Sequence, residues 1–206
     1  MQSLSNQNQS NKHFQDLMLH RVHDILLVAS PYDAFILEED GRLTEQILHE
    51  YLGMNLSYAP RVWQANTASY AMDLLSRRSV DLIIVMMRIS DMELVTFGKR
   101  IKEAYSKKPI ILLAFDESEI RQLPEKINDF LDNVFVWSGN SNVFPAIIKH
   151  VEDLKNVKRD TRKGDIRSII YIEDTPRYYS SILPLIYKET LFHTKQLIDK
   201  SLNNTQ

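Results

Sequence analysis

The segment that decides the fold is Val80–Met92, VDLIIVMMRISDM. Its centre, Leu82 to Met86, is an unbroken apolar run, and a polar turn at Ser90-Asp91 follows. A short run that is apolar on both faces is typical of a strand buried in a parallel sheet. Such a strand delivers its last residue to the sheet edge where α/β proteins bind ligands. Here that residue is Met86, and a thioether is an unexpected group at such an edge.

Further short apolar runs lie before and after this segment, and each is followed by a helical pattern of apolar residues. The alternation predicts an α/β fold: a doubly wound, five-stranded parallel sheet of flavodoxin-like type with strand order 2-1-3-4-5, plus an extra C-terminal β-α unit. Thr67 is a predicted N-cap for the second of the main helices. The expected strands span 24–29, 61–65, 82–86, 109–115 and 134–137, and the expected helices span 43–52, 92–105, 118–130 and 143–154, with one more after Thr67.

Composition divides the chain into four parts. Residues 1–12 are rich in Gln, Asn and Ser and are predicted to be a disordered tail. Residues 13–155 form the main domain, which opens with a short helix over 13–22. Residues 156–166 contain the charged stretch NVKRDTRKGD and are interpreted as a linker. In 167–206 a predicted strand, Arg167–Ile172, and a helix over 178–202 look like the start of a second domain.

Bulk properties exclude several classes of function. The net charge of −2 gives no basic field for nucleic acid. With no cysteine, disulfides and thiolate catalysis are excluded, and a reducing, cytoplasmic location fits. No apolar run is long enough to span a membrane. The six histidines lack the spacing of metal ligands, and no glycine-rich phosphate loop is present, so we expect no metal or nucleotide cofactor.

The order and wording of these elements resemble the receiver domain of two-component response regulators over about residues 24–154. The resemblance is strongest in VDLIIVMMRISDM, GKRIKEAYSKKPIILLAF and FVWSGN. It implies an acidic Mg²⁺-binding pair after strand one, a phosphoacceptor Asp after strand three, Thr or Ser after strand four and Lys after strand five. Those positions hold Ala29 and Ser30, Met86, Ala114 and Trp137. Because aspartyl phosphorylation needs a carboxylate nucleophile and a hard cation, the resemblance implies a phosphorylation-incompetent pseudo-receiver.

The predicted start of the second domain differs from that of the first, because its strand is followed by the acidic pair Glu173-Asp174. Together, ILLVASPYDAFILEEDG and IIYIEDTPRYYSSILPLIYKE resemble the N-terminal region of bacterial proteins related to phosphoenolpyruvate synthase and pyruvate phosphate dikinase. In those proteins receiver-like domains precede the catalytic domains. The resemblance implies that this chain is a non-catalytic regulatory part of a larger ATP-dependent phosphotransferase and that 167–206 begins a second receiver.

Several alternatives stay open. An active receiver that uses Asp91 or Asp116, with Mg²⁺, is one rival, and a flavodoxin-like domain that binds a small molecule is another. The acids around those two residues form a weak Mg²⁺ site or a set of helix caps. The run Glu38-Glu39-Asp40 reaches over the edge or forms a surface turn. We expect the partner to be a protein, another domain of the same chain or a second copy, because the apolar tail of a soluble monomer needs cover.

Overall fold

The structure, a computed structural model, describes residues 19–37, 43–54, 56, 58–163 and 168–203. Its centre is a five-stranded parallel sheet of order β2-β1-β3-β4-β5, which confirms the predicted topology. Each predicted strand of the main domain forms, and its ends lie within one residue of those expected. The strands are β1 (Asp24–Val28), β2 (Arg61–Ala65), β3 (Leu82–Val85), β4 (Ile110–Ala114) and β5 (Asn133–Val136).

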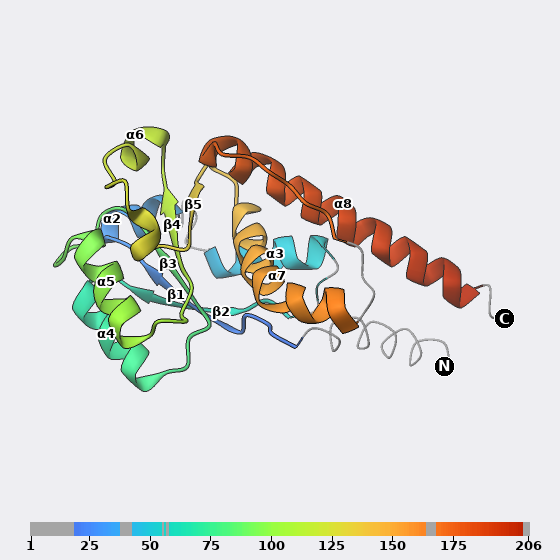
Figure 1. The fold of residues 1–206 in the computed structure, drawn as a ribbon, viewed down its shortest axis with the longest axis horizontal. Helices are drawn as coiled ribbons and strands as arrows, with labels where there is room; N and C mark the ends of the chain where they lie inside the picture. Colours follow the sequence, from blue (N-terminus) through green and yellow to red (C-terminus); the bar gives the residue numbers. More distant parts are fainter. Residues whose placement is uncertain (1–18, 38–42, 55, 57, 164–167, 204–206) are drawn as a thin grey trace.

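Helices cover both faces of the sheet (Figure 1). One face packs against α3 (Leu43–Gly53) and α7 (Val143–Lys163), and the other packs against α4 (Ala68–Arg77) and α5 (Leu94–Ala104). Alternate residues of a strand therefore enter different cores: Ile25 lies among the residues of the first face and Leu26 among those of the second. The remaining helices are α2 (Pro31–Leu37), α6 (Glu117–Ile120), the 3₁₀ turn η1 (Ile127–Asp129) and α8 (Pro176–Asn203).

Helix ends follow the local chemistry in two places. The Thr67 side chain accepts a hydrogen bond from the Tyr70 amide, which confirms the predicted N-cap of α4. The helix expected over 118–130 is instead split into the single turn α6 and η1, with Pro124 between them. A proline supplies no backbone donor, so a continuous helix is unfavourable there.

The linker prediction for 156–166 is wrong over its described part, because α7 continues to Lys163. Asn156 is buried, and its side chain accepts from the His20 amide and donates to the His20 carbonyl. Glu152, one turn earlier, accepts from the Val22 amide at 2.9 Å and pairs with Lys149 at 2.7 Å. We call these contacts the amino-terminal latch, since they fix the segment before β1 to the last helix of the main domain.

The start of the chain also differs from expectation. Residues 19–23 are not helical in the structure, so the described end of the helix expected over 13–22 does not form. The latch explains the difference, because backbone groups of His20 and Val22 bond to α7 side chains instead of to a helical turn. The rest of that expected helix, the tail 1–12 and the run Glu38-Glu39-Asp40 lie outside the described residues.

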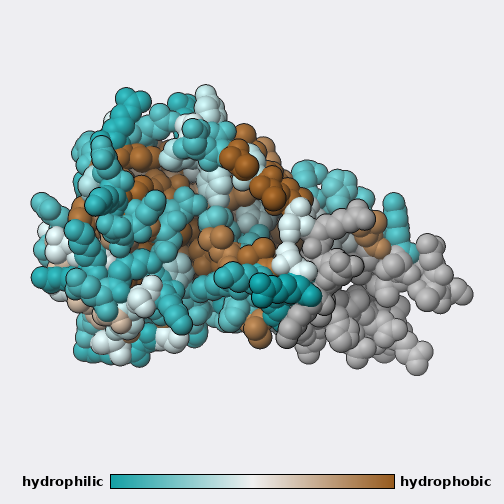
Figure 2. All heavy atoms as spheres, in the orientation of Figure 1, coloured by the Kyte–Doolittle hydropathy of each residue, from teal (hydrophilic) through white to brown (hydrophobic). Residues whose placement is uncertain are grey.

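The strand predicted over Arg167–Ile172 is wrong in its described part, since 168–175 belongs to no strand. The segment runs alongside α8, and α8 packs against α7 and β5 (Figure 1). A strand needs a neighbour, and helix α8 lies along the edge strand β5 where a sixth strand would join. Figure 2 shows apolar residues gathered over this segment and the start of α8.

Candidate functional site

The carboxyl edge of the sheet brings together the five positions that the receiver resemblance singled out. Ala29 and Ser30 follow β1, and their amides bond to the carbonyls of Ala65 and Arg88. Met86 follows β3, and its amide bonds to the carbonyl of Val28. Ala114 ends β4, and its carbonyl accepts from the Trp137 amide at 2.7 Å. Backbone hydrogen bonds between neighbouring strand ends therefore hold these positions along one edge.

Met86, at the position where the resemblance implies the phosphoacceptor, is buried. Its side chain is 1 % exposed and belongs to the core under α3 and α7, with Ile84 and Phe144. Ala29 and Ala114 are buried as well. None of these side chains offers a carboxylate, a hydroxyl or a charge, so this part of the edge is an extension of the apolar core.

Trp137 lies partly buried against the same core. Its ring meets that of Phe144 with centroids 5.7 Å apart and planes tilted by 54°. This contact is ordinary aromatic packing, and it gives the β5 end an apolar side chain where the receiver resemblance implies a lysine.

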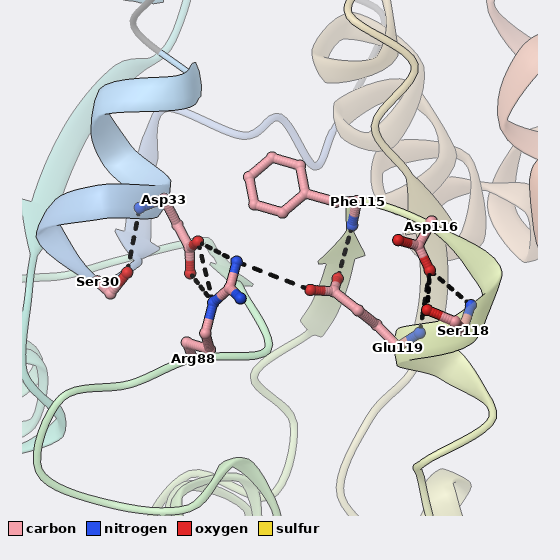
Figure 3. Close-up of polar contacts among 7 residues, drawn as sticks. All are labelled: Ser30, Asp33, Arg88, Phe115, Asp116, Ser118 and Glu119. Atoms are coloured by element: carbon pink, nitrogen blue, oxygen red, sulfur yellow. Dashed lines mark hydrogen bonds and ion pairs between the residues drawn. The ribbon is translucent and has the colours of Figure 1, made fainter.

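Charge enters the edge from two residues that the sequence analysis did not single out, Asp33 and Arg88 (Figure 3). Asp33 lies in the first turn of α2, where the Ser30 hydroxyl accepts from its amide at 3.1 Å. Its carboxylate is 1 % exposed and accepts from Arg88 Nη2 at 2.8 Å and from Arg88 Nε at 3.2 Å. Arg88 lies two residues beyond Met86, and its hydrogen bonds to Asp33 raise the pKa of its guanidinium.

Glu119 of α6 completes this arrangement, which we call the edge triad: Asp33, Arg88 and Glu119. One Glu119 oxygen lies 3.9 Å from Arg88 Nη2, and the other accepts from the Phe115 amide at 2.7 Å. The guanidinium therefore lies between carboxylates from α2 and α6, and its own side chain is 57 % exposed (Figure 3). The triad ties together the loops after β1, β3 and β4.

Two other acids near this edge, Asp91 and Asp116, act as helix caps. Asp91 accepts from the amides of Ala68 and Ser69 and from the Ser69 hydroxyl, and Asp116 accepts from the amides of Ser118 and Glu119. The hydrogen bonds from serine hydroxyls lower the pKa of both carboxyl groups. Of the two interpretations of these acids, the structure supports capping. Glu93 makes no capping bond, and Glu117 lies 3.7 Å from Arg121.

The divalent metal that the receiver resemblance implies does not fit this edge. The strand-end positions offer only the Ser30 hydroxyl, and the one buried carboxylate, Asp33, is bound to a guanidinium. Within the described ranges, no three His, Asp or Glu side chains form a metal-binding group. A cavity of about 230 Å³ beside Ala29 is lined by Leu27, Ala34, Gln64, Ala65, Asn66 and Tyr70, so its lining is uncharged too.

A second region with a dense hydrogen-bond network lies where β5, α7 and α8 meet, and we call it the seam. The Ser180 hydroxyl of α8 accepts from the Val136 amide of β5 at 2.8 Å. Tyr179 bonds to His150 Nδ1 at 2.9 Å, and the Asn133 side-chain amide lies 3.1 Å from His150 Nε2. Because an amide NH₂ only donates, Nε2 accepts and the imidazole is neutral. Burial lowers the pKa of His150.

Glu173 and Asp174, the acidic pair of the predicted second receiver, lie just before α8. Glu173 accepts from the Thr175 amide at 2.9 Å, and Asp174 lies 3.3 Å from the Thr175 hydroxyl. The structure thus places both acids in the turn that begins α8, where each contacts Thr175. No helix in the described chain is long and apolar enough to cross a membrane.

Comparison with solved structures identifies the fold. The chain is similar to a response regulator receiver domain protein from Clostridium thermocellum, with a TM-score of 0.51 and 13% identity, over 66% of this chain and 99% of that one. The receiver domain of a putative LuxO repressor from Vibrio parahaemolyticus has a TM-score of 0.50 and 13% identity, over 69% of this chain and 98% of that one. NtrX from Brucella abortus has a TM-score of 0.52 and 14% identity, over 73% of this chain and 31% of that one. No family model and no curated protein sequence matches. The likeness shows the receiver fold.

Proposed function

We propose that this chain is a signal-transduction or regulatory module, a pseudo-receiver that acts through protein contacts without being phosphorylated and without catalysis of its own. One observation supports it most strongly: a buried methionine, Met86, stands at the phosphoacceptor position, and the guanidinium of Arg88 occupies the adjacent edge. Phosphoryl transfer to the protein needs a carboxylate nucleophile and a divalent cation held by oxygens. The edge offers neither in a usable form.

The rival function, an active receiver, would need another acid. Asp91 and Asp116 both accept several hydrogen bonds at helix starts, and these bonds occupy the oxygens that would attack phosphorus. Asp33 is paired with Arg88 and is 1 % exposed, so a phosphodonor has no access to it.

Exposure to a phosphodonor tests the proposal. We expect the intact mass to stay unchanged after treatment with acetyl phosphate and Mg²⁺, and the melting temperature to stay unchanged with beryllofluoride. A stoichiometric phosphoryl adduct that is lost at alkaline pH would contradict the proposal. In that event Asp91→Asn, Asp116→Asn and Asp33→Asn would each be treated in the same way, because only the variant of the true acceptor would lose the adduct.

The proposal extends to a larger bacterial, cytoplasmic protein related to phosphoenolpyruvate synthase, in which this region is regulatory and other domains carry out ATP-dependent phosphotransfer. The sequences of residues 25–41 and 169–189, which carry the resemblance to such proteins, support this context. Residues 167–206 then begin a second receiver-like domain, and 168–172 would pair as a strand once the rest of its sheet follows. The genomic reading frame beyond Gln206 is the test: a second receiver and catalytic domains are expected, and a stop codon at that point would contradict it.

We also propose that two copies associate through their tails. Part of the tail is covered in cis, since Leu183 is buried against the main domain. Ile170 and Ile172 nevertheless stay 83 % and 88 % exposed, and apolar residues at such exposure indicate a contact surface. Light scattering should give a dimer for the parent chain and a monomer for the variant with Ile170→Lys and Ile172→Lys. Leu52→Lys, at an apolar site on α3 that is 59 % exposed, is the control that should remain dimeric.

A further inference from the structure

We infer that Arg88 is a built-in cation of the carboxyl edge: it occupies an oxygen site, made by Asp33 and Glu119, that would otherwise bind a divalent metal. The inference deepens the proposed function and rests on it, because it explains how a receiver fold keeps this edge closed without Mg²⁺. It concerns the same edge but different residues from the degenerate positions Ala29, Met86 and Trp137.

The pairing of Asp33 with Arg88 is unlike an ordinary surface ion pair. Asp33 is 1 % exposed, whereas the Arg88 side chain is 57 % exposed, so the carboxylate is buried and the cation lies on its solvent side. Two guanidinium nitrogens bind this carboxylate, and one of them also faces Glu119 at 3.9 Å. Two carboxylates from different helices thus converge on one positive charge.

Oxygen ligands of this kind suit a hard divalent ion as well as they suit a guanidinium. Without Arg88, Asp33 would be an isolated buried carboxylate, which is costly to keep ionised. A divalent cation held by Asp33, Glu119 and water would remove that cost, and the Ser30 hydroxyl lies next to Asp33 as a further oxygen. Loss of one arginine is therefore expected to expose a metal site, with no new acid introduced.

A matched ion pair in the same chain supplies the control. Arg61 pairs with Asp24 at 3.0 Å at the opposite end of the sheet, and Arg61 is also exposed. Asp24 has a second donor, the indole nitrogen of Trp63 at 2.9 Å, and no other carboxylate of the described chain pairs with Arg61. Removal of Arg61 therefore leaves Asp24 with a hydrogen bond and without a second acid to share a metal.

The test is a Mn²⁺ titration of the whole chain, with free Mn²⁺ followed by electron paramagnetic resonance. Arg88→Ser should bind one Mn²⁺ at least about tenfold more tightly than the parent chain or Arg61→Ser, a difference equivalent to about 1.4 kcal/mol. The double variant Asp33→Asn with Arg88→Ser should lose that binding. Mn²⁺ should also raise the melting temperature of Arg88→Ser alone.

Other results would overturn the inference. Equal Mn²⁺ binding by the parent chain would mean that Arg88 does not occupy the site, and no binding by Arg88→Ser would mean that the carboxylates are not metal ligands. If Arg88→Ser and Arg88→Gln both fail to fold, refolding with Mn²⁺ decides, since failure with Mn²⁺ present also refutes the site. The phosphodonor test uses the parent chain, so its failure and the failure of this inference are distinguishable.

Discussion

The edge triad and the seam close two sides of the same sheet by different means. At the edge, a buried carboxylate depends on one arginine, and three loops share that single charge. At the seam, α8 is held on β5 and α7 by separate neutral hydrogen bonds from Ser180 and Tyr179 and by the buried Leu183. The comparison teaches that loss of Arg88 should be costly and loss of Ser180 modest, because the first leaves a buried carboxylate without its cation and the second removes a neutral hydrogen bond.

The largest effect is expected from Met86→Asp at the edge. A carboxylate in this apolar site lacks a partner and leaves a void, so the free energy of unfolding should fall by about 4 kcal/mol. Burial would raise the pKa of the new Asp in the folded state, so the loss should be greater at neutral pH than near pH 4. Urea unfolding at both pH values measures it, with Met86→Leu as the control of similar volume. Full stability together with Mg²⁺ binding would contradict the apolar edge.

Arg88→Met should rank next, at about 3 kcal/mol, because Asp33 loses its cation while buried. The double variant Asp33→Leu with Arg88→Met removes both charges and should recover most of that loss. Chemical denaturation of the parent chain, both variants and Arg61→Met gives the comparison. If Arg88→Met lowers the free energy of unfolding no more than Arg61→Met does, the charge of Arg88 does not stabilise the edge.

At the seam, Ser180→Ala should cost about 1 kcal/mol, because it leaves the Val136 amide of the edge strand without its acceptor. Ser181→Ala is the matched control, since the Ser181 hydroxyl bonds to the Arg177 carbonyl within its own helix. Limited proteolysis should cut α8 faster in Ser180→Ala than in Ser181→Ala. Equal rates would mean that the hydrogen bond does not hold the tail.

The smallest effect is the pH dependence contributed by His150. Its folded pKa is lowered by burial from 6.5, so the unfolded chain takes up the proton first as the pH falls. His150 thus contributes stability above that pH, and this contribution is lost on further acidification. His150→Gln should show a shallower fall in stability between about pH 7.5 and pH 5. If the free energy of unfolding falls equally steeply with pH in both chains, folding does not lower the pKa of His150.

Sequence reasoning predicted the fold well because the signal was local. Leu82–Val85 and Ile110–Ala114 are apolar on both faces, and that pattern together with their short length is typical of a buried parallel strand. The pairing of Asp33 with Arg88 was missed because the two residues are 55 positions apart and each belongs to a loop or a short helix. A lone arginine two residues after the phosphoacceptor position was the available signal.

Two sequence predictions fail for different physical reasons. The charge of residues 156–166 is typical of a linker, but the stretch contains no helix breaker before Gly164 and its residues favour helices, so α7 continues to Lys163. The isoleucine-rich run at 168–172 has strand propensity, but the position next to β5 is occupied by α8. At 168–172 the neighbouring helix therefore decided the outcome.

The amino-terminal latch has a consequence for the order in which the protein is made. His20 and Val22 precede the interior strand β1, yet their partners Asn156 and Glu152 lie 136 and 130 residues later. During vectorial synthesis the ribosome must therefore release almost the whole main domain before these contacts form. Such distant pairings slow folding, because the entropy cost of closing a long loop comes before the contacts that stabilise it. A chain shortened at Leu154 would lose the contacts of Asn156 with His20 and keep that of Glu152 with Val22.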